Sequence, residues 1–217
     1  LYTVAQAQAS LKQLNPVDYD LEIAPHPQVR CIFRDAGHIL GSAIVEVWVG
    51  EGRHRRKIVF SGDLGQPARP LLRDPTPIRD ADLVLMESTY GDRNHKDRAE
   101  TIRELGGILD EAWRDGGNVL IPAFAVGRSQ ELLYWFAKHW DEWNLSRWTI
   151  FLDSPMAGKV VQVYGRHHEL FDEEARAVLI VKERLQRRAR RARARNPLLR
   201  AALAMNDGVL AVTVRYG

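Results

Sequence analysis

The sequence is poor in the features that mark secreted and membrane proteins. Cys31 is the single cysteine of the 217 residues, so no disulfide can form within the chain, which fits a reducing compartment. The longest uncharged apolar runs, for example 83–86 and 119–124, have the length of strands, whereas a membrane-spanning helix needs roughly 20 apolar residues. The first ten residues have neither the basic nor the apolar region of a signal peptide, and they lack an initiator methionine. We therefore expect a soluble cytoplasmic protein without membrane contact, whose N-terminal end has been cut or processed.

Charge is distributed unevenly along the chain. The formal net charge is +3, but residues 182–217 carry ten Lys and Arg against two acidic residues, whereas residues 1–181 carry 21 basic and 26 acidic residues. Seven of the twelve residues from 184 to 195 are arginine, and on a helix they would occupy every face, which leaves no apolar stripe for packing. This composition favours a solvated tail. A nucleic-acid-binding arm is the alternative.

Apolar periodicity divides the chain into a hairpin-rich part and a part in which helices and strands alternate. The first part is predicted to hold a helix at 4–14 and strands at 29–33, 43–49 and 57–60, the last two joined as a hairpin through Gly50-Glu51-Gly52. The continuous apolar run 82–86 is typical of a strand that is buried on both faces. In the second part, helices predicted at 96–113, 127–143 and 156–167 alternate with strands at 118–121 and 148–152. This alternation predicts an α/β fold with a parallel sheet and crossover helices.

Polar residues cluster directly after three of the predicted strands. They are Asp35-Ala36-Gly37-His38, Ser61-Gly62-Asp63 and Glu87-Ser88-Thr89-Tyr90-Gly91. Loops beyond the carboxyl ends of strands converge on the site in α/β architectures. One histidine and two carboxylates delivered in this way could bind a cation such as zinc. Taken singly, however, each cluster is more typical of a surface or turn residue.

Five motifs in register resemble the metallo-β-lactamase superfamily, specifically its β-CASP branch of RNA-processing nucleases. They are DAGHILGSA (35–43), VFSGDLG (59–65) followed by Arg69-Pro70, LVLMESTYGDR (83–93), NVLIPAFAVGRSQELL (118–133) and FLDSPMA (151–157). The resemblance covers about residues 1–175. It implies a partial metallo-β-lactamase αββα sandwich over 1–92 and a partial Rossmann-like β-CASP domain over 93–176. Residues 177–217 are then a basic Arg/Ala-rich tail, for which we consider an out-of-frame origin or a fused RNA-binding arm.

The resemblance also implies roles for individual residues. In this family two zinc ions lie at one edge of the sandwich, where His38 would bind one zinc and Asp63 would bridge both. Glu87 would orient a distant histidine that acts as the general acid. Gly127 and Arg128 open a predicted helix in the β-CASP part, where they could bind an RNA phosphate through backbone N–H groups and a guanidinium group. Helix capping with a structural arginine is an equally good interpretation of these two residues.

The most diagnostic element of the family, His-x-His-x-Asp-His, is absent from the sequence, and so are the histidines expected after FLDSPMA. Two zinc ligands do not complete a zinc site. We therefore interpret the chain as a fragment that supplies too few ligands for the two Zn²⁺ ions of the intact protein. The intact protein is expected to be a zinc-dependent RNA phosphodiester hydrolase, and this chain alone is expected to be inactive. RNA is the expected partner, and a homodimer is kept as an option. The alternatives are a non-catalytic β-CASP subunit of an RNA-processing complex and a small-molecule hydrolase of the wider superfamily.

Overall fold

A computed structural model describes residues 2–171, 175 and 209–214 of the chain. These residues fall into two compact units. The N-terminal unit consists of Leu1–Ala36, Gly41–Leu64 and Pro75–Glu87, and the C-terminal unit consists of Gly37–Leu40, Gly65–Asp74 and Ser88–Gly217. None of the helices in the described ranges has both the length and the apolar character that crossing a bilayer requires. The basic stretch 184–195, on which the tail prediction rests, lies outside the described residues.

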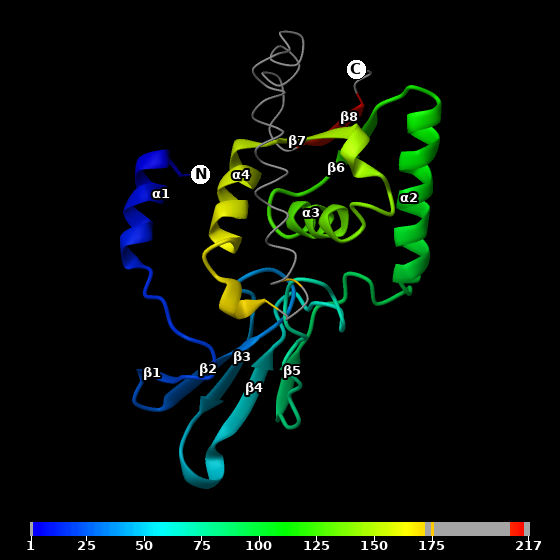
Figure 1. The fold of residues 1–217 in the computed structure, drawn as a ribbon. Helices are drawn as coiled ribbons and strands as arrows, with labels where there is room; N and C mark the ends of the chain where they lie inside the picture. The colour runs from blue at the N-terminus through cyan, green and yellow to red at the C-terminus, as the bar shows by residue number, and fades with distance from the viewer. Residues whose placement is uncertain (1, 172–174, 176–208, 215–217) are drawn as a thin grey trace. The chain divides into compact units, whose positions relative to one another are not determined.

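The N-terminal unit is built on one five-stranded sheet (Figure 1). Its strands follow the order of the chain: β1 (Glu22–His26), β2 (Val29–Asp35), β3 (Ala43–Val49), β4 (Arg56–Phe60) and β5 (Leu83–Leu85). Neighbouring strands from β1 to β4 are antiparallel, whereas β4 and β5 are parallel. The predicted hairpin is confirmed, because Val49 of β3 pairs with Arg56 of β4 across a 3₁₀ turn at Gly52–His54. A short helix, α1 (Val4–Ser10), continues as a 3₁₀ turn at Leu11–Gln13 and agrees with the predicted helix at 4–14.

Strand β5 departs from its prediction. The run 82–86 was expected to be buried on both faces, but its apolar side chains are between 46% and 67% exposed: Leu83, Val84, Leu85 and Met86. The reason is that β5 is the last strand of the described sheet and pairs only with β4 in it. A continuous apolar run indicates that a strand is suited to burial, but whether it is buried depends on other segments that pack on it.

The C-terminal unit alternates helices and strands as predicted. Its elements are α2 (Arg98–Arg114), β6 (Val119–Pro122), α3 (Arg128–Lys138), β7 (Trp148–Asp153), α4 (Pro155–Tyr164) and β8 (Val209–Val214), with 3₁₀ turns at Leu145–Arg147 and His168–Leu170. The α/β class is therefore confirmed, but the expected parallel pairing is wrong. β8 lies between β6 and β7 and is antiparallel to both, so β6 and β7 run in the same direction without pairing (Figure 1).

Two apolar clusters form the core of the C-terminal unit. The larger one is centred on fully buried Leu109 of α2 and Phe136 of α3, joined by Trp143, Leu145 and Trp148. The smaller cluster packs the Tyr134 side of α3 against α4 and the turn after it: Tyr134, Tyr164, Phe171 and Ala175. Helix α3 is thus held on two sides, which fixes the position of its N-terminal motif.

Candidate functional site

Two of the predicted site residues, Asp63 and Glu87, come together in the N-terminal unit. Because β4 and β5 are parallel, the loops at their carboxyl ends emerge at the same edge of the sheet. The Glu87 carboxylate Oε1 accepts a hydrogen bond of 2.7 Å from the backbone N–H of Leu64, the residue after Asp63. The Glu87 N–H donates to Ser61 Oγ at 3.1 Å, and the Ser61 N–H donates to the Leu85 carbonyl at 2.9 Å. Glu87 therefore holds the backbone of the Asp63 loop, a contact that sequence reasoning did not foresee; the roles predicted for both acids stay predictions.

His38 lies in a loop of the C-terminal unit. Two glycines, Gly65 and Gly127, approach this loop so closely that a side chain at either position would clash with it. A Cβ at Gly65 would lie 1.8 Å from the carbonyl oxygen of Gly37, so only glycine fits there. A Cβ at Gly127 would lie 2.9 Å from Ile39 Cγ2, and Gly127 has a φ of +83°. Close approach of Gly65 to the Gly37 carbonyl and of Gly127 to the Ile39 side chain thus sets the position of the His38 loop.

Tyr164 adds a hydrogen bond to the same loop. The backbone N–H of Leu40 donates to the Tyr164 hydroxyl at 3.3 Å, and the Tyr164 side chain is buried at the end of α4. Burial raises the pKa of Tyr164, against smaller opposing effects of this hydrogen bond and of the charge on Arg69. The Tyr164 hydroxyl oxygen thus accepts a hydrogen bond from the loop that carries His38. No signal in the sequence pairs residues that lie 124 positions apart.

Gly127 and Arg128 form the N-terminus of α3, where the sequence predicts a helix start. The Gly127 N–H donates to Gln130 Oε1 at 2.7 Å, which caps the helix. Arg128 Nη1 contacts Glu131 Oε2 at 2.9 Å, and Arg69 Nη2 contacts the same oxygen at 3.2 Å. The Glu131 side chain is only 14% exposed, whereas that of Arg128 is 55% exposed. The capping and structural interpretation thus has direct geometric support, and the phosphate-binding role stays a prediction.

The ion pair between Arg69 and Glu131 joins two motifs that lie far apart in the sequence. Arg69 follows VFSGDLG, and Glu131 belongs to GRSQE. The motifs themselves predict no role for either residue. Opposite charge is the only property of the sequence that could have predicted this pair, and many other residues in the chain are charged. The pair fixes the 65–74 loop against α3 within the C-terminal unit.

The described residues do not fit a zinc centre by themselves. In no place within the described ranges do three side chains of the His, Cys, Asp and Glu types come together as a possible metal site. Zinc sites in proteins use three or four protein ligands. His38 and Asp63 also fall in different units. These residues by themselves therefore support no chemical step through a metal.

Comparison with known proteins decides the family. The Beta-Casp domain family matches residues 129–207. "Ribonuclease TTHA0252" of Thermus thermophilus is 45% identical over 170 residues, which cover 78% of this chain and 38% of that protein. The chain belongs to the β-CASP group of the metallo-β-lactamase superfamily. This confirms the resemblance carried by the five motifs.

Two further relatives of this β-CASP chain come from eukaryotes. "Endoribonuclease YSH1" of Yarrowia lipolytica is 30% identical over 178 residues, covering 81% of this chain and 21% of that protein. "Cleavage and polyadenylation specificity factor 73" of Drosophila melanogaster is 30% identical over 183 residues, covering 83% of this chain and 26% of that protein. The chain thus spans between 21% and 38% of the length of these three relatives. The β-CASP match also continues beyond residue 176, which favours a β-CASP origin for part of the segment from 177 to 207; the boundaries predicted at 92 and 176 stay predictions.

Proposed function

We propose that the protein to which this chain belongs is an RNA phosphodiester hydrolase that depends on zinc. The proposal is supported by relatives that are named ribonuclease and endoribonuclease. The observation that carries it is the hydrogen bond between Glu87 and the backbone next to Asp63, because it brings two acidic motif residues to one sheet edge. His38 and Asp63 are the proposed metal ligands, and RNA is the proposed substrate. A cytoplasmic location and assembly as a homodimer are part of the same proposal.

Glu87 has a more specific role in this proposal. Its Oε1 already accepts the Leu64 N–H, so one carboxylate oxygen holds the Asp63 loop. In the proposed function, the Glu87 carboxylate also orients a general acid, which another part of the protein supplies. General acids contribute typically 10²- to 10⁴-fold to rate. The 217-residue chain alone is proposed not to cleave RNA, since its described residues do not fit a zinc centre.

The test uses the full-length protein encoded by the source gene and a labelled single-stranded RNA. Cleavage is expected for the full-length protein, with loss on chelation and recovery on addition of zinc. Replacement of Glu87 by Gln should lower kcat at least about a hundredfold, whereas the exposed hairpin variant Glu51→Gln should not. His38→Ala and Asp63→Asn should each lower the zinc content measured by elemental analysis. Full zinc content in both of these variants would contradict the ligand assignment, and zinc-dependent cleavage by the purified 217-residue chain would contradict its proposed inactivity.

A second candidate function is that of a non-catalytic β-CASP subunit in an RNA-processing assembly. The lack of a three-ligand cluster in the described ranges favours it, and one relative carries the name of a specificity factor. The same experiment separates the two functions. A full-length protein that binds RNA but contains no zinc and does not cleave would support the subunit and overturn the hydrolase.

A further inference from the structure

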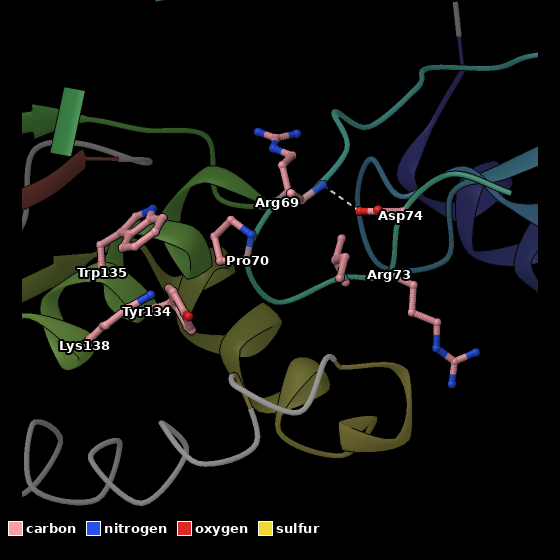
Figure 2. Close-up of a pocket in the computed structure, with 9 residues that line it drawn as sticks. Arg69, Pro70, Arg73, Asp74, Tyr134, Trp135 and Lys138 are labelled. Carbon is pink, nitrogen blue, oxygen red and sulfur yellow. Dashed lines mark hydrogen bonds between the residues drawn. The ribbon is translucent and has the colours of Figure 1, made fainter. Parts of the chain in front are cut away.

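A cavity of about 620 Å³ lies in the C-terminal unit, between the 68–74 loop and α3. Its volume falls within the roughly 300–1,000 Å³ of small-molecule sites. Helix α3 contributes two aromatic rings and an ammonium group, from Tyr134, Trp135 and Lys138. In Figure 2, the Pro70 ring faces these aromatic side chains across the cavity. The walls are therefore apolar and partly aromatic, which suits a flat ring.

Three cationic residues line this apolar cavity. Lys138 Nζ lies 5.1 Å from the centre of the Trp135 ring and 5.9 Å from that of Tyr134, within the range of cation–π contacts. Arg69 and Arg73 line the loop side and extend in different directions away from it (Figure 2). Asp74 is the one acidic residue of the lining, and its Oδ1 accepts the Ala68 N–H at 2.7 Å within the loop. The lining thus holds three cationic residues against one carboxylate, and Arg69 is also paired with Glu131 outside the lining, which leaves net positive charge for an anionic ligand.

The loop that forms one wall is braced at several points. Arg73 Nη2 donates to the Glu169 carbonyl at 2.8 Å, Arg98 donates to the Ala68 carbonyl, and Arg69 pairs with Glu131. Ala68 and Leu71 adopt positive φ values of 55° and 79°, which are costly for residues with a side chain. A conformation of this kind persists only where the surroundings hold it. The cavity is therefore a built feature of the unit.

We propose that this cavity binds one unstacked base of a single-stranded RNA, with Lys138 and the two loop arginines contacting neighbouring phosphates. The combination of aromatic faces with a positively charged groove is how proteins bind single strands without strong sequence preference. The proposal rests on the proposed function for the choice of RNA, but it concerns binding and is tested without cleavage. It adds a contact that holds the substrate strand at a place other than the residues predicted to do chemistry.

Fluorescence anisotropy of a labelled short oligoadenylate, titrated with the 217-residue chain, tests the proposal. Trp135→Leu keeps an apolar side chain but removes the aromatic face, and it should weaken binding roughly tenfold. Trp135→Phe should bind nearly as tightly as the parent protein, because it keeps an aromatic face. If Trp135 acted only by filling space, the Phe and Leu variants would bind equally. Lys138→Ala should weaken binding and reduce the slope of log K against log salt by about 0.7, the value for one phosphate of a single strand. Trp135→Leu should leave that slope unchanged.

Lys96→Ala is the matched control, because Lys96 is an exposed lysine of the same unit that does not line the cavity. Adenosine monophosphate should compete with the oligoadenylate, and duplex RNA should bind more weakly, since its bases are stacked. Binding that is equally strong in Trp135→Leu and Lys138→Ala would overturn the cavity assignment. So would tighter binding of duplex RNA, or no binding of the oligoadenylate at all. A full-length protein that fails to cleave RNA while these variants behave as expected would instead overturn the proposed hydrolase and leave this site intact.

Discussion

Two adjacent glycines of α2 are predicted to respond to the same substitution with opposite sign. A Cβ at Gly106 would lie 2.5 Å from Nε1 and 2.9 Å from Cδ1 of Trp143, whereas a Cβ at Gly107 would meet nothing within 4 Å. Alanine in a helix interior is more favourable than glycine by roughly 0.5–1 kcal/mol. Gly107→Ala should therefore raise the free energy of unfolding by about that amount.

Gly106→Ala gains the same helix propensity but must displace Trp143. That indole is 7% exposed, stacks on the His139 ring at 4.5 Å and contacts Phe136 edge-to-face at 6.3 Å. Overpacking a filled core costs typically about 1–3 kcal/mol. The net expectation is a loss of about 0.5–2 kcal/mol, which places the two variants about 1–3 kcal/mol apart.

Urea unfolding of both variants, followed by far-UV circular dichroism, measures this difference. The double variant Gly106→Ala/Trp143→Phe provides a check, because the smaller ring makes room for the new methyl group. Its stability should exceed that expected if the two single effects simply added. A Gly106→Ala protein that is as stable as Gly107→Ala would refute the reasoning, since it would mean that Trp143 does not press on this helix face.

Three further substitutions address other parts of the described structure. Glu46 is 4% exposed and contacts Arg34 Nε at 2.6 Å as well as Lys57; burial alone would raise the pKa of Glu46, but hydrogen bonds from these two cations outweigh it and lower that pKa. The stability that Glu46 contributes is therefore present above the ordinary carboxyl pKa and is lost as the pH falls below it. Glu46→Gln should lower the free energy of unfolding by about 3 kcal/mol at neutral pH and flatten the acid side of a curve of stability against pH. An unchanged acid side would contradict the role of Glu46 as an ionised, paired carboxylate. Burial, with a smaller effect of the Asp35 charge, raises the pKa of Tyr19 to about 12, and its hydroxyl donates to the Ser42 carbonyl at 2.7 Å. Tyr19→Phe should cost about 1 kcal/mol and remove the stability loss that the parent protein shows between pH 10 and about 12, as thermal melts at several pH values would show. Ser154 Oγ accepts the Ala157 N–H at 3.1 Å, so Ser154→Ala should lower stability by about 1 kcal/mol in chemical denaturation, whereas Ser154→Asp should retain most of it.

Local chemistry explains which parts of the fold were predictable. Gly50 and Gly52 separate two β-branched runs, and the β3–β4 hairpin forms there. Ser154-Pro155 combines an N-cap with a proline at the first helical position, and α4 begins at Pro155. These features depend on residues within a few positions of one another. Boundaries of this kind can be assigned without any knowledge of tertiary structure.

The errors arise where distant segments decide the outcome. The run 82–86 has the same composition whether it is covered or lies at a sheet edge, and β5 lies at the edge of the described sheet. Strand β8 inserts between β6 and β7 from a region in which no strand was expected, and this makes both ladders antiparallel. Strand β1 was not expected, since Pro25 lies within it. Proline occurs in sheets mainly on edge strands and at bulges, and Pro25 lies on an edge strand where the pairing with β2 shifts register between Ile23 and His26.

In the candidate site, too, the features that could be predicted are local, and those that could not be predicted join distant residues. Convergence of the Asp63 and Glu87 loops could be expected, because consecutive strand ends with polar residues are typical of a site edge. The hydrogen bond from Leu40 to Tyr164 and the ion pair between Arg69 and Glu131 could not, since they join residues 124 and 62 positions apart. The sequence therefore identifies residues that carry chemistry more readily than those that hold them in place.

The 65–74 loop shows why such holding contacts matter for the proposed RNA site. It is fixed at Gly65 by close approach to Gly37, at Arg69 by Glu131, and at Arg73 by the Glu169 carbonyl. Anchors at both ends and in the middle set the shape of the cavity wall before a ligand arrives, so binding need not order this loop. Loss of affinity in variants of Trp135 or Lys138 should then report the contacts those side chains make with the strand. A variant that breaks an anchor, such as Glu131→Gln, acts on the wall itself and should weaken binding without changing which ligand is preferred.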